Sequence, residues 1–119
     1  IATDLGAVLQ GGMGMAASGN IGDKQAFFEP VHGSAPKHAG QNKVNPIASI
    51  NSIQMMMDWL GRKKSNDQMV QIGKLIDDSV ADHLKDGKNL TYDLGGKSSC
   101  SFVGESISSR LADKLAEQF

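Results

Sequence analysis

The stretch from Phe27 to Gly40, with the sequence FFEPVHGSAPKHAG, limits what this chain can fold into more than any other part. Its apolar beginning predicts a short strand over residues 26–29, which ends at Pro30 because proline lacks the N–H that a central strand needs. A polar loop rich in His, Gly, Ser and Lys follows. Loops that a rigid scaffold places at strand ends are common ligand-binding segments.

The residue types of this loop suit an anion that carries an aromatic base. Lys37 offers a positive charge, Ser34 a hydroxyl group, and Gly33 a backbone that a ligand can approach closely. His32 and His38 offer flat rings for stacking. The same composition also fits a surface loop that only turns the chain, and these residues alone do not separate the two interpretations.

Composition excludes several classes of protein. A length of 119 residues permits one modest domain, and a formal net charge of -1 argues against a general binder of nucleic acids or anionic membranes. No apolar run approaches the roughly 18 residues of a membrane span, and no secretory signal is visible. The single cysteine, Cys100, excludes an internal disulfide and fits a reducing compartment. We therefore expect a cytoplasmic protein, with mitochondria as the alternative location.

The spacing of apolar residues predicts four amphipathic helices and few strands. We expect helices over residues 1–10, 45–60, 65–85 and 102–119, strands over residues 13–17 and 26–29, and a loop over residues 18–25. Asn45 is the expected N-cap of the second helix and Pro46 its first residue, with Gly61 as its stop. Because a helix N-terminus attracts anions, this start beside a lysine-bearing loop favours phosphate binding.

Four details are expected at the ends of the other helices. Ser65 and Gln68 are predicted to form a capping box, and Gly87 is predicted to end that helix. His83 is predicted to lie at the polar edge near the C-terminus, where a positive charge is favoured. Residues 98–101 are interpreted as the approach to the N-cap of the last helix.

The segment from Gly12 to Ala17 fits the glycine-rich dinucleotide fingerprint by residue type but not by context. That fingerprint needs a strand before it and a helix after it, whereas here a helical pattern precedes it and a turn-like sequence follows. We therefore reject the match. Because strands are few and the chain opens at Ile1 inside a helical pattern, we expect a segment of a longer chain.

Several motifs together resemble those of the β-decarboxylating dehydrogenases, the family of isocitrate, isopropylmalate, homoisocitrate and tartrate dehydrogenases. The motifs are NIG at 20–22, FEPVHGSAPK at 28–37, AG at 39–40, NP at 45–46 and DLGG at 93–96. The resemblance implies an α/β fold in which residues 1–119 form one unit, the C-terminal part of the large cofactor-binding domain. It also implies binding of a nicotinamide dinucleotide without the usual Rossmann fingerprint.

The resemblance also implies which residues contact the cofactor. His32 to Ala35 match the family's adenosine and ribose loop, Val44 and Asn45 match its adenine contacts, and Glu29 matches an acidic residue near the nicotinamide. The full implied set is Glu29, His32, Gly33, Ser34, Ala35, Lys37, His38, Val44, Asn45, Tyr92 and Asp93.

Two positions separate NADP-dependent from NAD-dependent members. Lys37 and His38 match the Lys and aromatic ring that grip the 2′-phosphate of NADP, where NAD-dependent members commonly carry Asp and an aliphatic residue. Tyr92 matches a further phosphate contact, but Gly96 stands where NADP-dependent isocitrate dehydrogenases carry arginine. NADP is therefore the expected cofactor, with NAD as the alternative.

The resemblance places the metal site and the catalytic residues largely outside this chain. Asp4 matches the second of two aspartates, one helical turn apart, that bind Mg²⁺ or Mn²⁺. The substrate-binding arginines and the catalytic tyrosine and lysine belong to earlier regions of the family's chain, so no catalytic residue is expected here. The implied reaction oxidises a small 2-hydroxy acid and then removes carbon dioxide.

Three functions remain open. The first is the cofactor-binding part of a homodimeric, NADP-dependent isocitrate dehydrogenase of the tricarboxylic acid cycle. The second is 3-isopropylmalate or homoisocitrate dehydrogenase with NAD. The third, from a different class, is an isolated nucleotide-binding or helical interaction module without catalysis.

Overall fold

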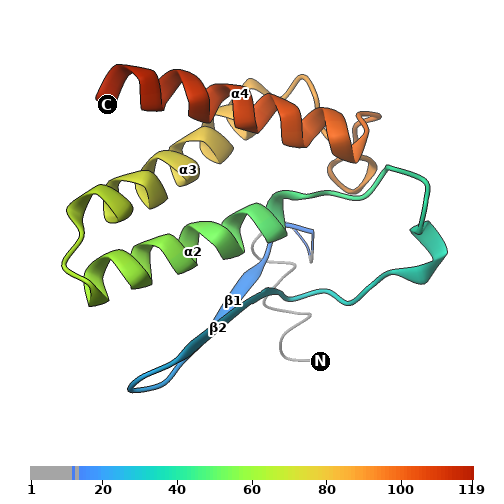
Figure 1. Ribbon diagram of the computed structural model, residues 1–119. Helices are drawn as coiled ribbons and strands as arrows, with labels where there is room; N and C mark the ends of the chain where they lie inside the picture. Colours follow the sequence, from blue (N-terminus) through green and yellow to red (C-terminus); the bar gives the residue numbers. More distant parts are fainter. Residues whose placement is uncertain (1–11, 13) are drawn as a thin grey trace.

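The computed structural model describes residue 12 and residues 14–119 (Figure 1). Their elements are β1 (Ala17–Ile21), β2 (Ala26–Pro30), the 3-10 turn η1 (Pro36–His38), α2 (Ile47–Lys63), α3 (Asp67–Asp86), the 3-10 turn η2 (Tyr92–Leu94) and α4 (Cys100–Gln118). The helix predicted over residues 1–10 and the predicted metal ligand Asp4 lie outside the described residues. None of the described helices is long and apolar enough to cross a membrane.

The two strands form an antiparallel hairpin, in which Ala17 pairs with Pro30 and Ile21 with Ala26. The strand over 26–29 is confirmed. The predicted strand was wrong at residues 14–16, and the predicted loop was wrong at residues 18–21, which belong to β1, but is confirmed at residues 22–25. Gly14 and Met15 form a turn, and pairing with β2 makes Ser18 to Ile21 extended despite the low strand propensity of Gly and Asn. Tertiary pairing thus overrides the local preference.

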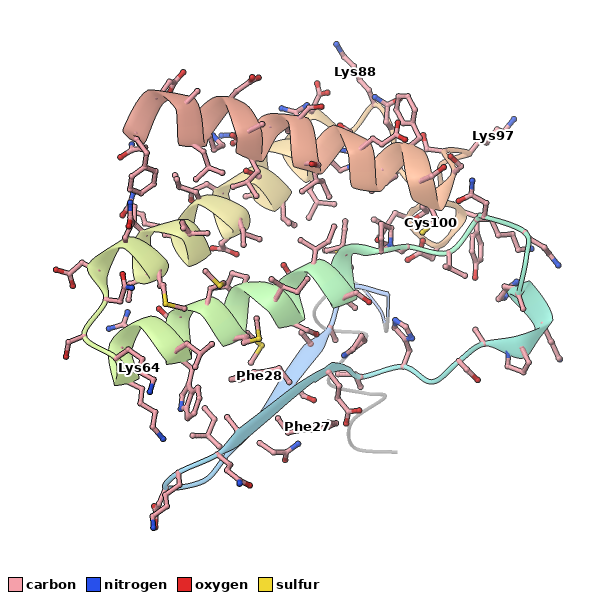
Figure 2. The ribbon with its side chains drawn as sticks, viewed as in Figure 1. Phe27, Phe28, Lys64, Lys88, Lys97 and Cys100 are labelled. Atoms are coloured by element: carbon pink, nitrogen blue, oxygen red, sulfur yellow. The ribbon has the colours of Figure 1, made fainter. Side chains whose placement is uncertain are left out.

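The hairpin packs against α2 (Figures 1 and 2). The Phe28 and Trp59 ring centroids lie 6.1 Å apart in a tilted arrangement. Lys63 reaches back from the end of α2, where its ammonium group donates a 2.9 Å hydrogen bond to the Lys24 carbonyl oxygen and lies 4.7 Å from the Trp59 ring centroid. These contacts fix the hairpin, and therefore the start of the following loop, relative to α2.

Helix α2 continues through Gly61, so the predicted stop at this glycine was wrong. A Cβ atom at position 61 would lie 2.7 Å from the backbone nitrogen of Val70 in α3. Gly73 of α3 makes the matching approach, since its Cβ would lie 3.2 Å from the Gln54 carbonyl oxygen. Both glycines therefore serve close packing between α2 and α3 rather than helix termination.

The N-cap of α3 is Asn66, not the predicted Ser65. The Asn66 side chain accepts a 3.1 Å hydrogen bond from the Met69 N–H, while Ser65 adopts a positive φ of 51° in the turn before it. The predicted stop at Gly87 is confirmed, because this residue takes the left-handed conformation that glycine allows (φ 68°). At α4, Ser99 caps the helix through the Phe102 N–H, as the serine-rich approach predicted.

The core lies where the start of α2, the end of α3 and the start of α4 meet. Its buried cluster contains Ile47, Val80, Val103 and Ile107. His83 is only 2% exposed beside this cluster, and its Nδ1 lies 3.1 Å from the Ser106 hydroxyl oxygen on α4. The prediction that His83 lies at a polar edge was wrong, because α4 covers that face of α3. Burial lowers the pKa of His83 below its ordinary value.

Candidate functional site

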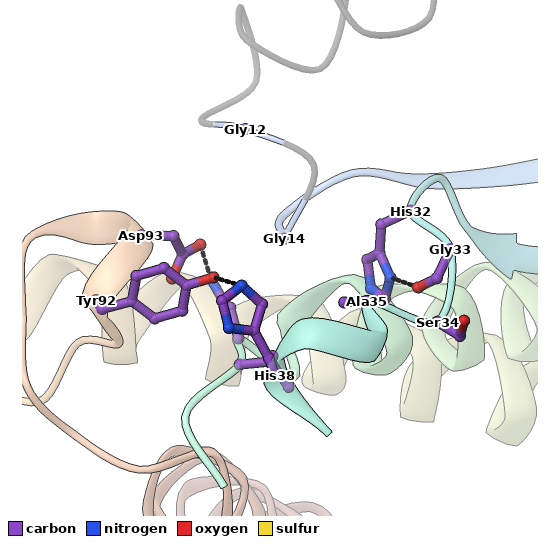
Figure 3. A pocket seen from close by; sticks show the side chains of 11 residues that line it. Gly12, Gly14, His32, Gly33, Ser34, Ala35, His38, Tyr92 and Asp93 are labelled. Atoms are coloured by element: carbon purple, nitrogen blue, oxygen red, sulfur yellow. Dashed lines mark hydrogen bonds between the residues drawn. The ribbon is translucent and has the colours of Figure 1, made fainter. Parts of the chain in front are cut away.

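A pocket of about 490 Å³ opens between the loop after β2, the start of α2 and η2 (Figure 3). Its volume lies within the range of roughly 300–1,000 Å³ that is typical of small-molecule sites. Every predicted cofactor-binding residue except Glu29 and Lys37 lines it, and two glycines complete the lining: Gly12, Gly14, His32, Gly33, Ser34, Ala35, His38, Val44, Asn45, Tyr92 and Asp93.

The buried amide of Asn45 organises one wall of the pocket. Its side-chain oxygen accepts a 2.9 Å hydrogen bond from the Ile47 N–H at the start of α2. Its side-chain nitrogen donates a 3.1 Å hydrogen bond to the Asp93 carboxylate, which also accepts from the Thr91 hydroxyl group. A Cβ atom at position 14 would lie 2.7 Å from the Asp93 Oδ2, so only glycine fits against this wall.

Two rings from distant segments meet at the pocket. The His38 and Tyr92 ring centroids lie 5.5 Å apart, and a 3.3 Å hydrogen bond joins the Tyr92 hydroxyl group to His38 Nε2 (Figure 3). The other ring nitrogen of His38, Nδ1, is buried without a hydrogen-bond partner among the described residues. Such a nitrogen suits a ligand polar group, because buried polar atoms ordinarily have partners.

The loop that crosses the pocket has a fixed backbone. His32 Nδ1–H donates a 2.8 Å hydrogen bond to the Gly33 carbonyl oxygen, and Gln41 donates a 3.0 Å bond to the Lys37 carbonyl oxygen. Ala35 adopts a left-handed conformation with φ 45°, which costs a non-glycine residue roughly 1 kcal/mol. A strained backbone conformation persists only where contacts with the surrounding structure hold it in place. Such conformations are common in ligand-binding segments.

Asn42 ties the end of this loop to α4. Its carbonyl oxygen accepts from the Cys100 N–H, and its side-chain oxygen accepts from the Ser101 N–H, both at 2.9 Å. Its side-chain nitrogen donates to the Ser101 hydroxyl oxygen at 2.8 Å. The segment between η1 and α2 is thus held at both ends, by Asn42 on α4 and by Asn45 on α2.

The start of α2 does not present its first N–H groups to the pocket. The Ile47 N–H donates to Asn45, and the Ala48 N–H donates a 2.9 Å hydrogen bond to the Gly14 carbonyl oxygen. The prediction that this helix start attracts a phosphate group is therefore wrong for these two donors, since each already has a partner.

Glu29 and Lys37 do not line the pocket. Glu29 is exposed on β2, where it is the strand partner of Ser18. Lys37 is exposed in η1, one residue before His38, which does line the pocket. Among residue 12 and residues 14–119, no group of three or more His, Cys, Asp or Glu side chains could hold a metal ion. Asp4 lies outside that range.

Sequence reasoning missed Gly12, Gly14 and Thr91. The two glycines were considered as part of a fingerprint, and that match is excluded because a strand, β1, follows them where the fingerprint needs a helix. The closely spaced glycines in the sequence were the one feature that could have indicated their place in the pocket lining. Thr91 is 1% exposed and bonds Asp93, and its signal was a hydroxyl residue two positions before an acidic one, the arrangement of a local side-chain turn.

Comparison with known proteins identifies relatives of this chain. The family model described as "Isocitrate/isopropylmalate dehydrogenase" matches residues 1–107. The homoisocitrate dehydrogenase of Methanocaldococcus jannaschii is 44% identical over 97% of this chain and 31% of its own length. The 3-isopropylmalate dehydrogenase of Thermobifida fusca is 44% identical over 96% of this chain and 30% of its own length.

Solved structures agree with this relationship. The β-decarboxylating dehydrogenase of Thermococcus kodakarensis superimposes with a TM-score of 0.81 at 41% identity, over 95% of this chain and 31% of that one. The isocitrate dehydrogenase of Methylococcus capsulatus superimposes with a TM-score of 0.79 at 35% identity, over 91% and 30%. The chain thus spans less than a third of the length of these relatives and has their α/β fold. It belongs to the isocitrate/isopropylmalate dehydrogenase family of β-decarboxylating dehydrogenases.

Proposed function

We propose that this chain is the C-terminal part of the large domain of a β-decarboxylating dehydrogenase and binds the adenosine half of NADP. The observation that carries the proposal is one pocket lined by three separate segments, residues 32–35 with His38, residues 44–45 and residues 92–93. These segments were expected to bind the cofactor from the family's motifs alone. Their convergence around one cavity is not required by packing, because the buried core lies elsewhere, between the three helices.

Each wall of the pocket suits a different part of an adenine nucleotide. Val44 and Asn45 offer an apolar side chain and a fixed backbone for the adenine base. Gly33 has no atom within 4 Å of a would-be Cβ, so its backbone is open to a ribose or phosphate. His38 and Tyr92 offer ring nitrogen and hydroxyl groups near the ribose, and Lys37 extends from the adjoining position.

The nicotinamide of such a cofactor accepts a hydride from the substrate when it is bound. The role proposed for this chain is to hold the other end of the cofactor, exclude water from the adenine and fix the orientation of the dinucleotide. Asp4 is the proposed ligand of Mg²⁺ or Mn²⁺. The residues that bind and deprotonate the 2-hydroxy acid, for which isocitrate is the proposed substrate, are proposed to lie in a preceding part of the enzyme.

NAD is the alternative cofactor, and Gly96 favours it. A Cβ atom at position 96 would lie on the Leu90 carbonyl group, so this backbone accommodates no arginine without moving. With NAD, homoisocitrate or 3-isopropylmalate becomes the proposed substrate, as in the names of two of the relatives above. The enzyme is proposed to be a cytoplasmic homodimer in either case.

The test is to titrate the full-length enzyme with NADP and NAD and to follow binding by fluorescence. Turnover is then assayed with isocitrate, homoisocitrate and 3-isopropylmalate in the presence of Mg²⁺. The proposal predicts tighter binding of NADP and turnover of isocitrate. Preferential binding of NAD with turnover of either other acid would replace it by the alternative. A folded protein that binds neither dinucleotide would support a non-catalytic module instead.

A further inference from the structure

Lys43 lies beside the pocket with its charge directed at a pocket residue. Its ammonium nitrogen lies 5.4 Å from the ring centroid of Tyr92, and Tyr92 in turn bonds His38. Among the described residues, no carboxylate lies within ion-pair distance of Lys43, whereas Lys88, just after α3, and Lys114 on α4 do form ion pairs with aspartates. The chain therefore holds an unneutralised cation at the edge of the His38–Tyr92 pair.

The backbone around Lys43 explains why its side chain stays at this place. Asn42, the preceding residue, is fixed to α4 by three hydrogen bonds, and Asn45 is fixed to the start of α2. Val44, the following residue, lines the pocket itself. Lys43 is thus carried on a short segment that is anchored on both sides, which lowers the entropy cost of placing its charge.

The helix starts near this edge do not offer their first N–H groups to an anion. The first three N–H groups of α4, those of Cys100 to Phe102, donate to Asn42 and Ser99, and the first two of α2 are also used. The position of Gly96 leaves no room for a side chain, because Leu90 occupies it. Lys43 is therefore the cation that the structure places in contact with the Tyr92 ring, where a phosphate group at its hydroxyl group could use it.

We propose that Lys43 is a specificity-determining residue that binds the 2′-phosphate of the adenosine ribose, in place of a cation at position 96. This inference rests on the proposed function, because it assumes that the pocket holds an adenosine nucleotide. Lys43 contacts the Tyr92 ring, and Lys37 belongs to η1, one residue before His38, so the inference places the phosphate between these two lysines. A dianionic phosphate gains a charge-assisted contact from each, while the ribose hydroxyl group of NAD gains less.

The test compares two probes on the full-length enzyme, adenosine 2′,5′-bisphosphate and adenosine 5′-monophosphate, by calorimetric titration. The variant Lys43→Met keeps the length of the side chain and removes its charge, and Lys43→Arg keeps the charge. The control is Lys64→Met, because Lys64 is an exposed lysine at the far end of α2, about 25 Å from the helix start at 1.5 Å per residue (Figure 2).

The inference predicts that Lys43→Met weakens the bisphosphate about ten-fold and the monophosphate less than about two-fold. Lys43→Arg should restore most of this loss, and Lys64→Met should change neither probe. Equal losses for both probes, or no loss for either, would overturn the role of Lys43 while wild-type binding still supported the proposed function. A wild-type enzyme that binds neither probe would overturn the proposed function as well.

Discussion

Asn45 is the residue on which the pocket and the fold depend together. One side-chain amide satisfies the Ile47 N–H at the start of α2 and also holds the Asp93 carboxylate against the pocket. Because the amide is buried, removal of either bond leaves an unpartnered polar group. Stability and the shape of the pocket wall are therefore coupled at this position.

The change Asn45→Ala should lower the free energy of unfolding by about 1–3 kcal/mol and weaken nucleotide binding. The control is Asn66→Ala, which removes the N-cap of α3 far from the pocket lining. It should cost about 1 kcal/mol and leave nucleotide affinity unchanged. Denaturant unfolding and calorimetric titration of both variants measure the two effects. Parallel losses of affinity in both variants would show that Asn45 has no local role in binding.

Lys37 is the residue that the family resemblance assigns to cofactor choice. The change Lys37→Asp places a negative charge at the position proposed for the 2′-phosphate of NADP, so the affinity for NADP should fall at least about ten-fold more than that for NAD. Lys64→Asp, at the other end of α2, is the matched charge change and should alter neither. Equal effects of Lys37→Asp on both dinucleotides would contradict its assignment.

At the scale of the elements, glycines set how closely the helices pack. Gly61 in α2 faces α3 with no room for a methyl group, whereas Gly104 in α4 has no atom within 4 Å of a would-be Cβ. Alanine is favoured over glycine in a helix by roughly 1 kcal/mol, so the surroundings decide the sign of each substitution.

Gly61→Ala should destabilise the protein by at least about 1 kcal/mol, because Val70 would have to move. Gly104→Ala should stabilise it by about 0.5–1 kcal/mol. Thermal or denaturant unfolding of the two variants distinguishes these outcomes. If both variants were more stable than the wild type, α2 and α3 would have room for a methyl group at position 61, which would contradict the close contact described above.

The stability of the contact between α3 and α4 should depend on pH through His83, which is buried between these two helices. Burial lowers its pKa in the folded protein below the ordinary value of about 6.5, so the unfolded chain binds a proton at a higher pH than the folded one. The stability that neutral His83 contributes is therefore fully present above about pH 6.5 and declines as the pH falls below it. Charged groups also meet between the two helices, where Asp86 and Asp82 of α3 pair with Arg110 and Lys114 of α4.

Unfolding free energies measured between about pH 7.5 and pH 5.5 should fall in the wild type and fall less in His83→Gln. The variant Asp82→Asn controls for the surface pairs, and its pH dependence over this interval should match the wild type, because Lys114 lowers the pKa of Asp82 still further below this window. Identical slopes for the wild type and His83→Gln would contradict the assignment to His83.

At the scale of the whole molecule, the sequence predicted the pocket better than it predicted the strands. The motifs that include His32 to Ala35, Val44, Asn45 and Tyr92 are local, and they do line one cavity. Strand β1 was misplaced because its residues, Ser18 to Asn20, carry no strand pattern and become extended only by pairing with β2. His83, Gly61 and Lys43 depend on which segment packs against them, and local spacing does not contain that information.

The structure also explains why composition alone left the loop after β2 ambiguous. A polar turn and a ligand-binding loop have the same residue types, and the difference lies in the segments that meet it. The loop becomes one wall of a pocket only because η2 arrives from more than fifty residues away, where Tyr92 bonds His38. The pairing of these two rings is a property of the whole fold.

The most direct test of the central claim is a crystal structure of the full-length enzyme at saturating NADP. The adenine should lie between Val44, Asn45 and the loop at 32–35, with the 2′-phosphate near Tyr92 and the Lys37 and Lys43 ammonium groups. Density for the nucleotide at another place, with this pocket empty, would contradict the claim that these residues form the cofactor site.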